Sequence, residues 1–376
     1  MPSCKPSHAD DPVTLPDAGA GGLSPQSGTP CRVLPHLNVR PFVPADASGV
    51  VRCAWLAYGF TRPDNRLYDP DGLIRLNASG SVAGLVAASA DGSILGYACL
   101  DFAANRFVPE YTDLVIAPDA RNNPLLLRRM LEFGRELAIA RDCVGVVANA
   151  VTAHTISQRG ALRFNGVPIG VHLGGVSTRW SLSGSGAQGD VRQSEIAIYM
   201  PGPHGAERVL YCPERHVALT RSIYDALNEP VRFADADEAA VPDKPTELSV
   251  EGGLRAWGHA VIDVERLGSD AEAAIASYLY VIRAEDIATV LLHLRLSDPA
   301  APSLAGRFER MGFSFSGVFP NAGPAGADDL LIYQYLHGVE TDLAGEKVVE
   351  RCRALHDYVI AERHRVDAVV SGRTLL

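Results

Sequence analysis

The sequence predicts an α/β protein of two consecutive domains, each with a mixed central sheet flanked by helices. The chain has 376 residues, which is too long for one ordinary domain and suits two of about 150 residues each. Hydrophobic residues make up 47% of the chain and charged residues 21%, which is typical of globular domains. Strand-like and helix-like segments alternate once within residues 37–205 and again within residues 206–376, and these ranges are the two expected domains.

The first 36 residues differ in composition from the rest of the chain. They contain seven prolines and four glycines and no hydrophobic period, so they predict a disordered tail.

Charge and cysteine usage narrow the class of protein further. The net charge of −10 argues against indiscriminate binding to nucleic acids or membranes, and no apolar run is long enough for a membrane span. The seven cysteines include no C-x-x-C pair, which indicates a cytoplasmic protein without a structural metal.

In the first domain the clearest local pattern is a hairpin. Apolar runs at 82–89 and 94–101 flank Asp91 and Gly92, a pair that favours a type I′ turn. Other strands are expected at 37–42, 111–117, 144–150, 167–173 and 195–200, and helices near 50–58, 70–77, 124–141 and 153–164.

The second domain repeats this alternation with weaker patterns. Strands are expected at 209–211, 254–264, 288–296, 313–319 and 330–336, and helices at 214–227, 270–284, 302–311 and 346–368.

Residues 112–126 read Thr-Asp-Leu-Val-Ile-Ala-Pro-Asp-Ala-Arg-Asn-Asn-Pro-Leu-Leu, and this segment resembles the donor-binding segment of the GCN5-related N-acetyltransferase (GNAT) family. In that family a strand ending in V-x-P precedes R/Q-x-x-G-x-G/A and a helix whose first amides bind the pyrophosphate of coenzyme A. Residues 154–166 and 308–313 resemble a later segment of the family fold. The resemblance spans residues 37–345 and implies two GNAT-like domains with splayed sheets. The order of elements also resembles freestanding bacterial tandem GNAT proteins, some of which belong to natural-product pathways, and implies that the second half is a degenerate copy.

The resemblance implies an amide-forming acyltransferase that acts on an amine or amide-like nitrogen of a small molecule. The catalytic base would be Asp113, Glu110 or His154, and Ser157 stands where many members carry a tyrosine acid. The residues expected to hold the donor are Leu114, Val115, Ile116, Ala117, Arg121, Asn122, Asn123, Leu125 and Asn149.

The expected donor is aminoacyl-tRNA or acyl-CoA, and no tightly bound cofactor is expected. Pro124 stands at the glycine position of the loop and has no N–H for a phosphate, which predicts weak binding of coenzyme A and favours aminoacyl-tRNA. Between residues 118 and 180 there are eight arginines and four acids, consistent with a phosphate-rich partner or with a solvated helix face. A non-catalytic GNAT-like binding protein remains an alternative. The arginines expected to contact phosphate are Arg128, Arg129, Arg135, Arg159 and Arg163.

Overall fold

The computed structural model describes residues 37–376, apart from residues 122, 181–190, 204, 237–240, 252–256, 324–327, 340, 342 and 374–376. The predicted tail of residues 1–36 and Asn122 of the donor loop therefore lie outside the described residues. From Leu34 onward the chain forms one compact unit. We refer to residues 37–201 as the N-terminal half and 208–373 as the C-terminal half, and the domain boundary between 205 and 206 stays a prediction.

The N-terminal half contains the strands and helices that its apolar patterns predicted, with ends shifted by a few residues. Its elements are β1 (Asn38–Pro41), α1 (Ala47–Tyr58), α2 (Pro70–Ser79), β2 (Val82–Ala88), β3 (Ile94–Asp101), β4 (Glu110–Ile116), α3 (Pro124–Ile139), β5 (Gly145–Val151), α4 (Ile156–Leu162), β6 (Val167–Val176) and β7 (Gln193–Pro201).

The hairpin of β2 and β3 is confirmed, but its turn is not the expected type I′. That turn needs a positive φ at both central residues, whereas Gly92 has a φ of 83° and Asp91 is not among the described residues with positive φ. The Gly92 amide donates to Ser89 O and the Asp91 carboxylate accepts from the Ser93 amide. The connection is therefore a longer loop that ends in a glycine bulge. The hydrogen bond that the Asp91 carboxylate accepts stabilises this wider turn.

The C-terminal half contains two short strands that the sequence did not predict, β9 (Val231–Phe233) and β10 (Glu247–Glu251), because β9 is very short and most residues of β10 are polar. Its other elements are β8 (Arg208–Leu210), α5 (Glu214–Leu227), β11 (His259–Arg266), α6 (Ala271–Ala284), β12 (Thr289–Arg295), α7 (Ala301–Arg310), β13 (Ser314–Phe319), β14 (Leu330–Leu336) and α8 (Glu350–Arg373).

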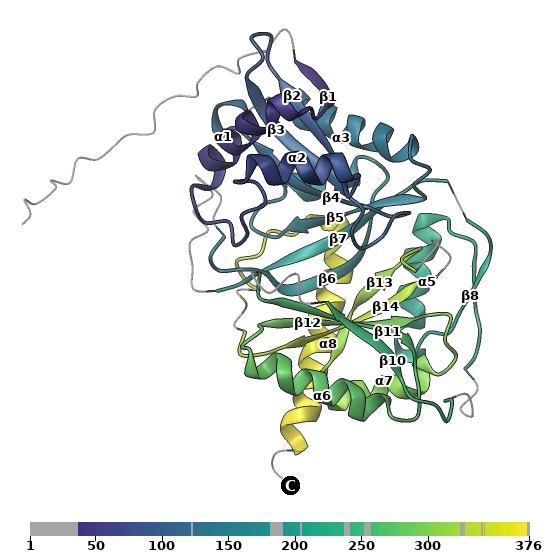
Figure 1. The fold of residues 1–376 in the computed structure, drawn as a ribbon. Helices are drawn as coiled ribbons and strands as arrows, with labels where there is room; N and C mark the ends of the chain where they lie inside the picture. Colours follow the sequence, from purple (N-terminus) through teal and green to yellow (C-terminus); the bar gives the residue numbers. More distant parts are fainter. Residues whose placement is uncertain are drawn as a thin grey trace, which may run out of the picture. The chain divides into compact units, whose positions relative to one another are not determined.

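Both halves share one arrangement of strands, and the mixed α/β class is confirmed. The large sheet has the order β1-β2-β3-β4-β5-β7-β6-β13-β14-β12-β11-β10, so that β4-β5-β7-β6 and β11-β12-β14-β13 are equivalent series. Each series begins with a parallel pair whose strands are connected through a helix. The two halves therefore repeat one topology and meet through the equivalent strands β6 and β13 (Figure 1).

Within the large sheet, the two halves meet at a contact between glycines. Gly317 of β13 pairs with Gly170 of β6, and a Cβ atom on Gly317 would lie 2.4 Å from Gly170 Cα. Only glycine fits at such a close approach of two backbones.

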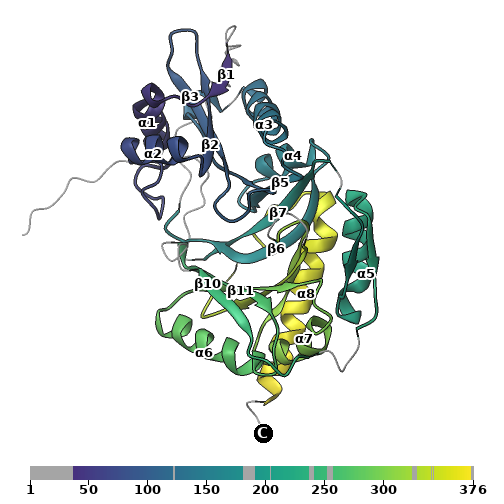
Figure 2. The same ribbon diagram turned by 45° about the vertical axis from the view of Figure 1, so that its right-hand side comes forward.

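Helices cover the sheet unevenly. In the N-terminal half, α1 and α2 lie on one side of the sheet and α3 and α4 on the other (Figure 2). In the C-terminal half, α5 to α8 share one hydrophobic cluster with the inward residues of β11 to β14. The opposite face of those strands carries a small separate apolar cluster that includes Val261, Leu291 and Ile332, and none of these four helices contributes to it.

Hydrogen bonds from buried side chains hold the two halves together. Gln158 of α4 donates to Lys347 O at 2.8 Å and accepts from the Val349 amide at 3.0 Å. Gln334 of β14 exchanges two bonds with the backbone of Leu173 on β6. Among the described residues, no helix is long and apolar enough to cross a membrane.

Candidate functional site

Strand β4 separates from β5 and leaves one backbone edge open. Among the described residues the two strands pair only at Glu110 and Val147. On its other side β4 pairs with β3, and the register shift there coincides with a φ of 55° at Asp113. A bulge of this kind increases the twist of a strand and turns the rest of β4 away from β5.

The open edge places particular amides of β4 toward the gap. The Ala117 amide donates to Leu95 O of β3 at 2.9 Å, and backbone groups alternate between the two edges of a strand. The amides of Leu114 and Ile116 therefore face the gap, whereas those of Val115 and Ala117 face β3. Of the four expected strand residues, Leu114 and Ile116 are placed to bind an acyl carbonyl.

The start of α3 offers few free amides to a phosphate. The Asn123 amide donates to Ala120 O at 3.1 Å, and the Leu126 amide donates to Asn123 O at 3.2 Å. The Asn123 side chain caps the helix by accepting from the Leu125 amide at 3.0 Å, and Pro124 has no N–H. Asn123 and Leu125, expected to hold the donor, instead complete the helix cap.

Asp113 is buried among arginines. Its carboxylate pairs with Arg62 at 2.5 Å and with Arg66 at 2.9 Å, and its side chain is 1% exposed. Arg62 also pairs with Asp64, and Arg66 with Asp101. Both carboxylate oxygens thus already accept from guanidinium groups, so Asp113 is poorly placed to take a proton from a substrate and better placed to position the loop after α1.

Glu110 is the carboxylate at the fork where β4 and β5 separate. It accepts a hydrogen bond from Asn149 Nδ2 of β5 at 3.2 Å. Burial raises the pKa of Glu110 to about 6, and the nearby Asp101 and Asp113 carboxylates contribute. A carboxylate with this pKa is a suitable base near neutral pH.

A second carboxylate near Glu110 was not predicted from the sequence. Glu195 of β7 is half-buried, and burial raises its pKa to about 8, with Glu110 adding to the effect. It is therefore mostly protonated at pH 7. Its only sequence signal was a charged residue at the start of an apolar strand.

His154 lies between the end of β5 and the start of α4, and Ser157 lies in the first turn of α4. Burial lowers the pKa of His154, and Lys347 and Arg121 lower it further. The imidazole is therefore neutral at pH 7. His154 Nδ1 and Ser157 Oγ are buried without a hydrogen-bond partner among the described residues. They lie on the donor side of the gap, away from Glu110, and the structure does not bring them together with it.

The arginines expected to bind phosphate are exposed on α3 and beside α4. Arg128 pairs with Glu132 at 2.7 Å, and Arg129 is 4.0 Å from the same carboxylate. Arg135, Arg159 and Arg163 are exposed and form no ion pair with another described residue. Arg121 is half-buried and its Nε donates to Ile116 O, which places it at the open end of the gap.

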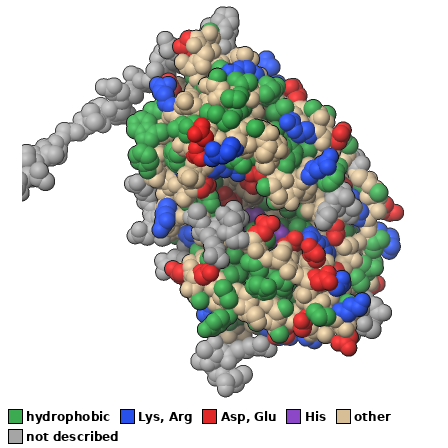
Figure 3. Space-filling model, viewed as in Figure 1, with side chains coloured by type: hydrophobic (Ala, Val, Ile, Leu, Met, Phe, Trp, Pro, Cys, Tyr) green, Lys and Arg blue, Asp and Glu red, His purple; other side chains and the backbone are tan. Residues whose placement is uncertain are grey.

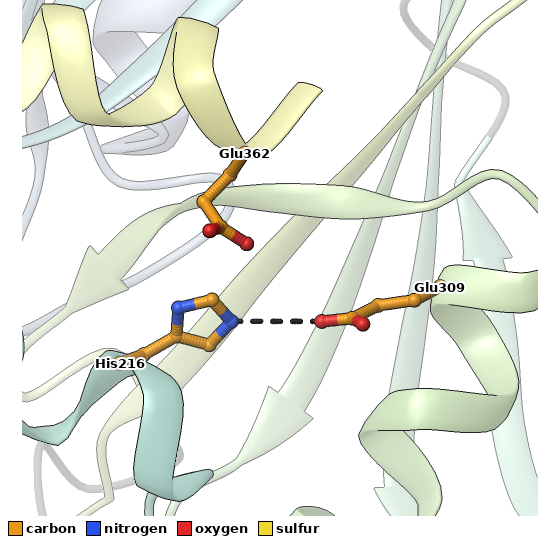
Figure 4. Close-up of side chains that lie close together, drawn as sticks. All are labelled: His216, Glu309 and Glu362. Carbon is orange, nitrogen blue, oxygen red and sulfur yellow. Dashed lines mark ion pairs between the residues drawn. The ribbon is translucent and has the colours of Figure 1, made fainter. Parts of the chain in front are cut away.

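A histidine and two glutamates cluster between helices of the C-terminal half (Figure 4). His216 Nε2 lies 3.8 Å from Glu309, and the candidate ligand atoms of His216, Glu309 and Glu362 lie within 4.8 Å of one another. Arg365 already bridges both carboxylates at 2.8 and 2.7 Å. A guanidinium in this position supplies the positive charge that a metal would bring, so we assign the cluster to helix packing.

A separate cavity of about 330 Å³ lies between α3 and the starts of β4 and β5. Its walls are mainly apolar and include Tyr111, Leu131, Val146 and Phe164, with Arg135 among the lining residues. It is at the opposite end of α3 from the donor loop, so it is distinct from the gap.

Comparisons with known proteins give partial structural likeness only. No protein-family model matches the sequence, and no curated protein is similar to it in sequence. Among solved structures, one described as a GNAT-family acetyltransferase from Desulfovibrio desulfuricans is 17% identical, with a TM-score of 0.35, over 44% of this chain and 99% of that chain. One described as an acetyltransferase from Salmonella typhimurium with acetyl-CoA is 15% identical, with a TM-score of 0.36, over 46% of this chain and 97% of that chain. A phosphinothricin acetyltransferase from Sinorhizobium meliloti, in complex with acetyl-CoA, is 17% identical, with a TM-score of 0.35, over 44% of this chain and 88% of that chain.

Proposed function

We propose that this chain is a tandem GNAT-type acyltransferase that forms an amide on the nitrogen of a small-molecule amine. The observation that carries the proposal is the open edge of β4 beside a carboxylate of raised pKa, Glu110. Among its described residues the C-terminal half has no equivalent gap, because β11 and β12 pair over five residues. The donor site is therefore assigned to the N-terminal half alone.

In the proposed reaction the acyl carbonyl oxygen accepts hydrogen bonds from the amides of Leu114 and Ile116. These fixed dipoles stabilise the negative charge that develops when the amine attacks. A C–N bond forms, the bond from the acyl carbon to the leaving oxygen or sulfur breaks, and one proton passes from the amine to the leaving atom. Glu110 accepts the proton from the amine, and most of the rate enhancement comes from holding the two substrates together.

The proposed donor is aminoacyl-tRNA. Three amides at the start of α3, those of Asn123, Leu125 and Leu126, are already bonded within the loop, and Pro124 has none. This arrangement disfavours the pyrophosphate of coenzyme A, since each lost charge-assisted hydrogen bond costs about 1.5–3 kcal/mol. The exposed Arg159 and Arg163 next to the gap suit a polyanionic donor. A cytoplasmic location and a role in a natural-product pathway belong to this proposal.

The test combines the purified protein with charged tRNA or with acyl-CoA and a panel of amines, and detects new amides by mass spectrometry. We expect product from charged tRNA, none after ribonuclease treatment, and none with Glu110→Gln. Glu251→Gln is a matched control, since Glu251 is an exposed residue of β10.

Each other result identifies an alternative. Product from acyl-CoA that is unaffected by ribonuclease would support the transferase activity and would make acyl-CoA the donor in place of aminoacyl-tRNA. Absence of any amide from both donors, with donor binding intact, would favour a non-catalytic binding protein.

A further inference from the structure

A row of polar side chains crosses from one half to the other on a single face of the sheet. The strand register pairs His172 of β6 with Glu195 of β7, and His293 of β12 with Asp263 of β11. Directly paired residues of neighbouring strands share a face. Between the two pairs lie the glycine junction of β6 and β13 and Ile332 of β14, which pairs with Gly317 on one side and His293 on the other and so lies on the same face.

The row lies in a recess between the two halves. Figure 3 shows a hollow there, with histidine at its floor and acidic side chains near its rim. The C-terminal wall is the strand face that α5 to α8 leave uncovered. Glu110 and Asn149 continue the row toward the donor gap. All six polar residues are half-buried: Glu110, Asn149, His172, Glu195, Asp263 and His293.

Several atoms of the row have no internal partner. His172 Nε2, Asn149 Oδ1 and Asp263 Oδ1 are buried without a hydrogen bond to another described residue. The other oxygen of Asp263 accepts from Arg295 at 2.9 Å, so its carboxylate is only partly satisfied. Buried polar atoms without partners cost stability, and a clustered set of them facing one recess indicates a polar ligand.

The charge state of the row constrains what it binds. Burial lowers the pKa of His172 to about 3 and that of His293 to about 4, so both imidazoles are neutral at pH 7. Glu195 is mostly protonated there, and Asp263 is balanced by Arg295. The row therefore presents mainly neutral donors and acceptors, and among its six residues free negative charge at neutral pH is confined to Glu110 at the end nearest the gap.

We propose that the recess binds the acceptor, and that the acceptor is a small amine whose body carries hydroxyl or amide groups. His293 and Asp263 of the C-terminal half hold the body through hydrogen bonds, and the amine lies at Glu110. This inference rests on the proposed function and deepens it, because it gives the half without a donor site a role in substrate specificity. A polycation would lack enough counter-charges in the row, and an apolar amine would leave the polar atoms of the row unpaired.

Calorimetry on the whole protein, without donor, tests the binding directly. The probes are glucosamine as a hydroxylated amine, spermidine as a polycation and phenylethylamine as an apolar amine. We expect glucosamine to bind best, and His293→Ala or Asp263→Asn to weaken its binding up to about tenfold, as one lost neutral hydrogen bond implies. His364→Ala is the matched control, because His364 is exposed on α8.

Stronger binding of spermidine or phenylethylamine, or equal affinities for His293→Ala and His364→Ala, would overturn the inference. Thermal melts of each variant exclude unfolding as the cause of lost binding. The two proposals fail in different ways. Binding that depends on His293, without amide formation from any donor, would refute the transferase alone. Amide formation with an acceptor KM unchanged in His293→Ala and Asp263→Asn would refute the recess alone.

Discussion

At the scale of single residues, two carboxylates on one strand have different chemistry because of their surroundings. Asp113 is held by Arg62 and Arg66, whereas Glu110 accepts a hydrogen bond from Asn149. The sequence identified both as candidates for the catalytic base. The choice between them depends on the loop after α1, whose arginines lie about 50 positions away in the chain and carry no local signal.

The first residue-scale prediction concerns Glu110. A general base works when it is deprotonated, so kcat/KM should rise with pH through about 6, the raised pKa of Glu110, and then level off with respect to this group. Glu110→Gln should lower turnover by about 100-fold or more. The rise of kcat/KM with pH through this range should also disappear in the variant. An unchanged limb in the variant would assign the base to another group.

The second residue-scale prediction concerns Asp113. Asp113→Asn removes the charge that neutralises two buried or half-buried arginines, and breaking a buried pair in this way costs about 3–5 kcal/mol. Urea denaturation should detect the loss, with Asp225→Asn on the exposed side of α5 as the control. A variant that keeps full stability but loses turnover would restore Asp113 as the catalytic base.

At the scale of elements, the junction of β6 and β13 depends on glycine. Gly317→Ala would place a Cβ 2.4 Å from Gly170 Cα and from Ile169 O, which forces the strands apart. We expect a loss of about 1–3 kcal/mol, as for other overpacked sites, measured by chemical denaturation. Gly372→Ala is the control, since nothing lies within 4 Å of a Cβ there. Equal stabilities of the two variants would show that the junction tolerates a side chain.

Local sequence patterns predicted most helices and strands, but not how the strands of the two halves come together in the sheet. The apolar runs of β5 and β12 and the amphipathic α3 and α5 have periodicity strong enough to read from sequence. The recess depends instead on the register that brings His172 and His293 onto one face, and these residues are separated by more than a hundred positions. The cap by Asn123 could have been read from an Asx residue before Pro124, and it accounts for part of the altered donor loop.

At the scale of the whole molecule, charge is unevenly distributed, and this bears on the donor. The chain has a net charge of −10, yet Arg135, Arg159 and Arg163 form an exposed group around α3 and α4. If tRNA docks there, each neutralised phosphate releases counterions. The logarithm of the binding constant should then fall with the logarithm of salt concentration, with a slope of about −0.7 to −0.9 per phosphate.

Filter binding of charged tRNA across a salt series measures this slope. Arg159→Glu with Arg163→Glu should weaken binding at low salt and make the slope shallower by about one to two, because two phosphate contacts are lost. Arg283→Glu with Arg310→Glu, exposed on α6 and α7 in the other half, changes the net charge by the same amount and should affect binding less. Equal effects of the two kinds of variant would mean that tRNA responds only to the total charge of the protein. In that case the arginines around α4 do not form a donor-binding surface.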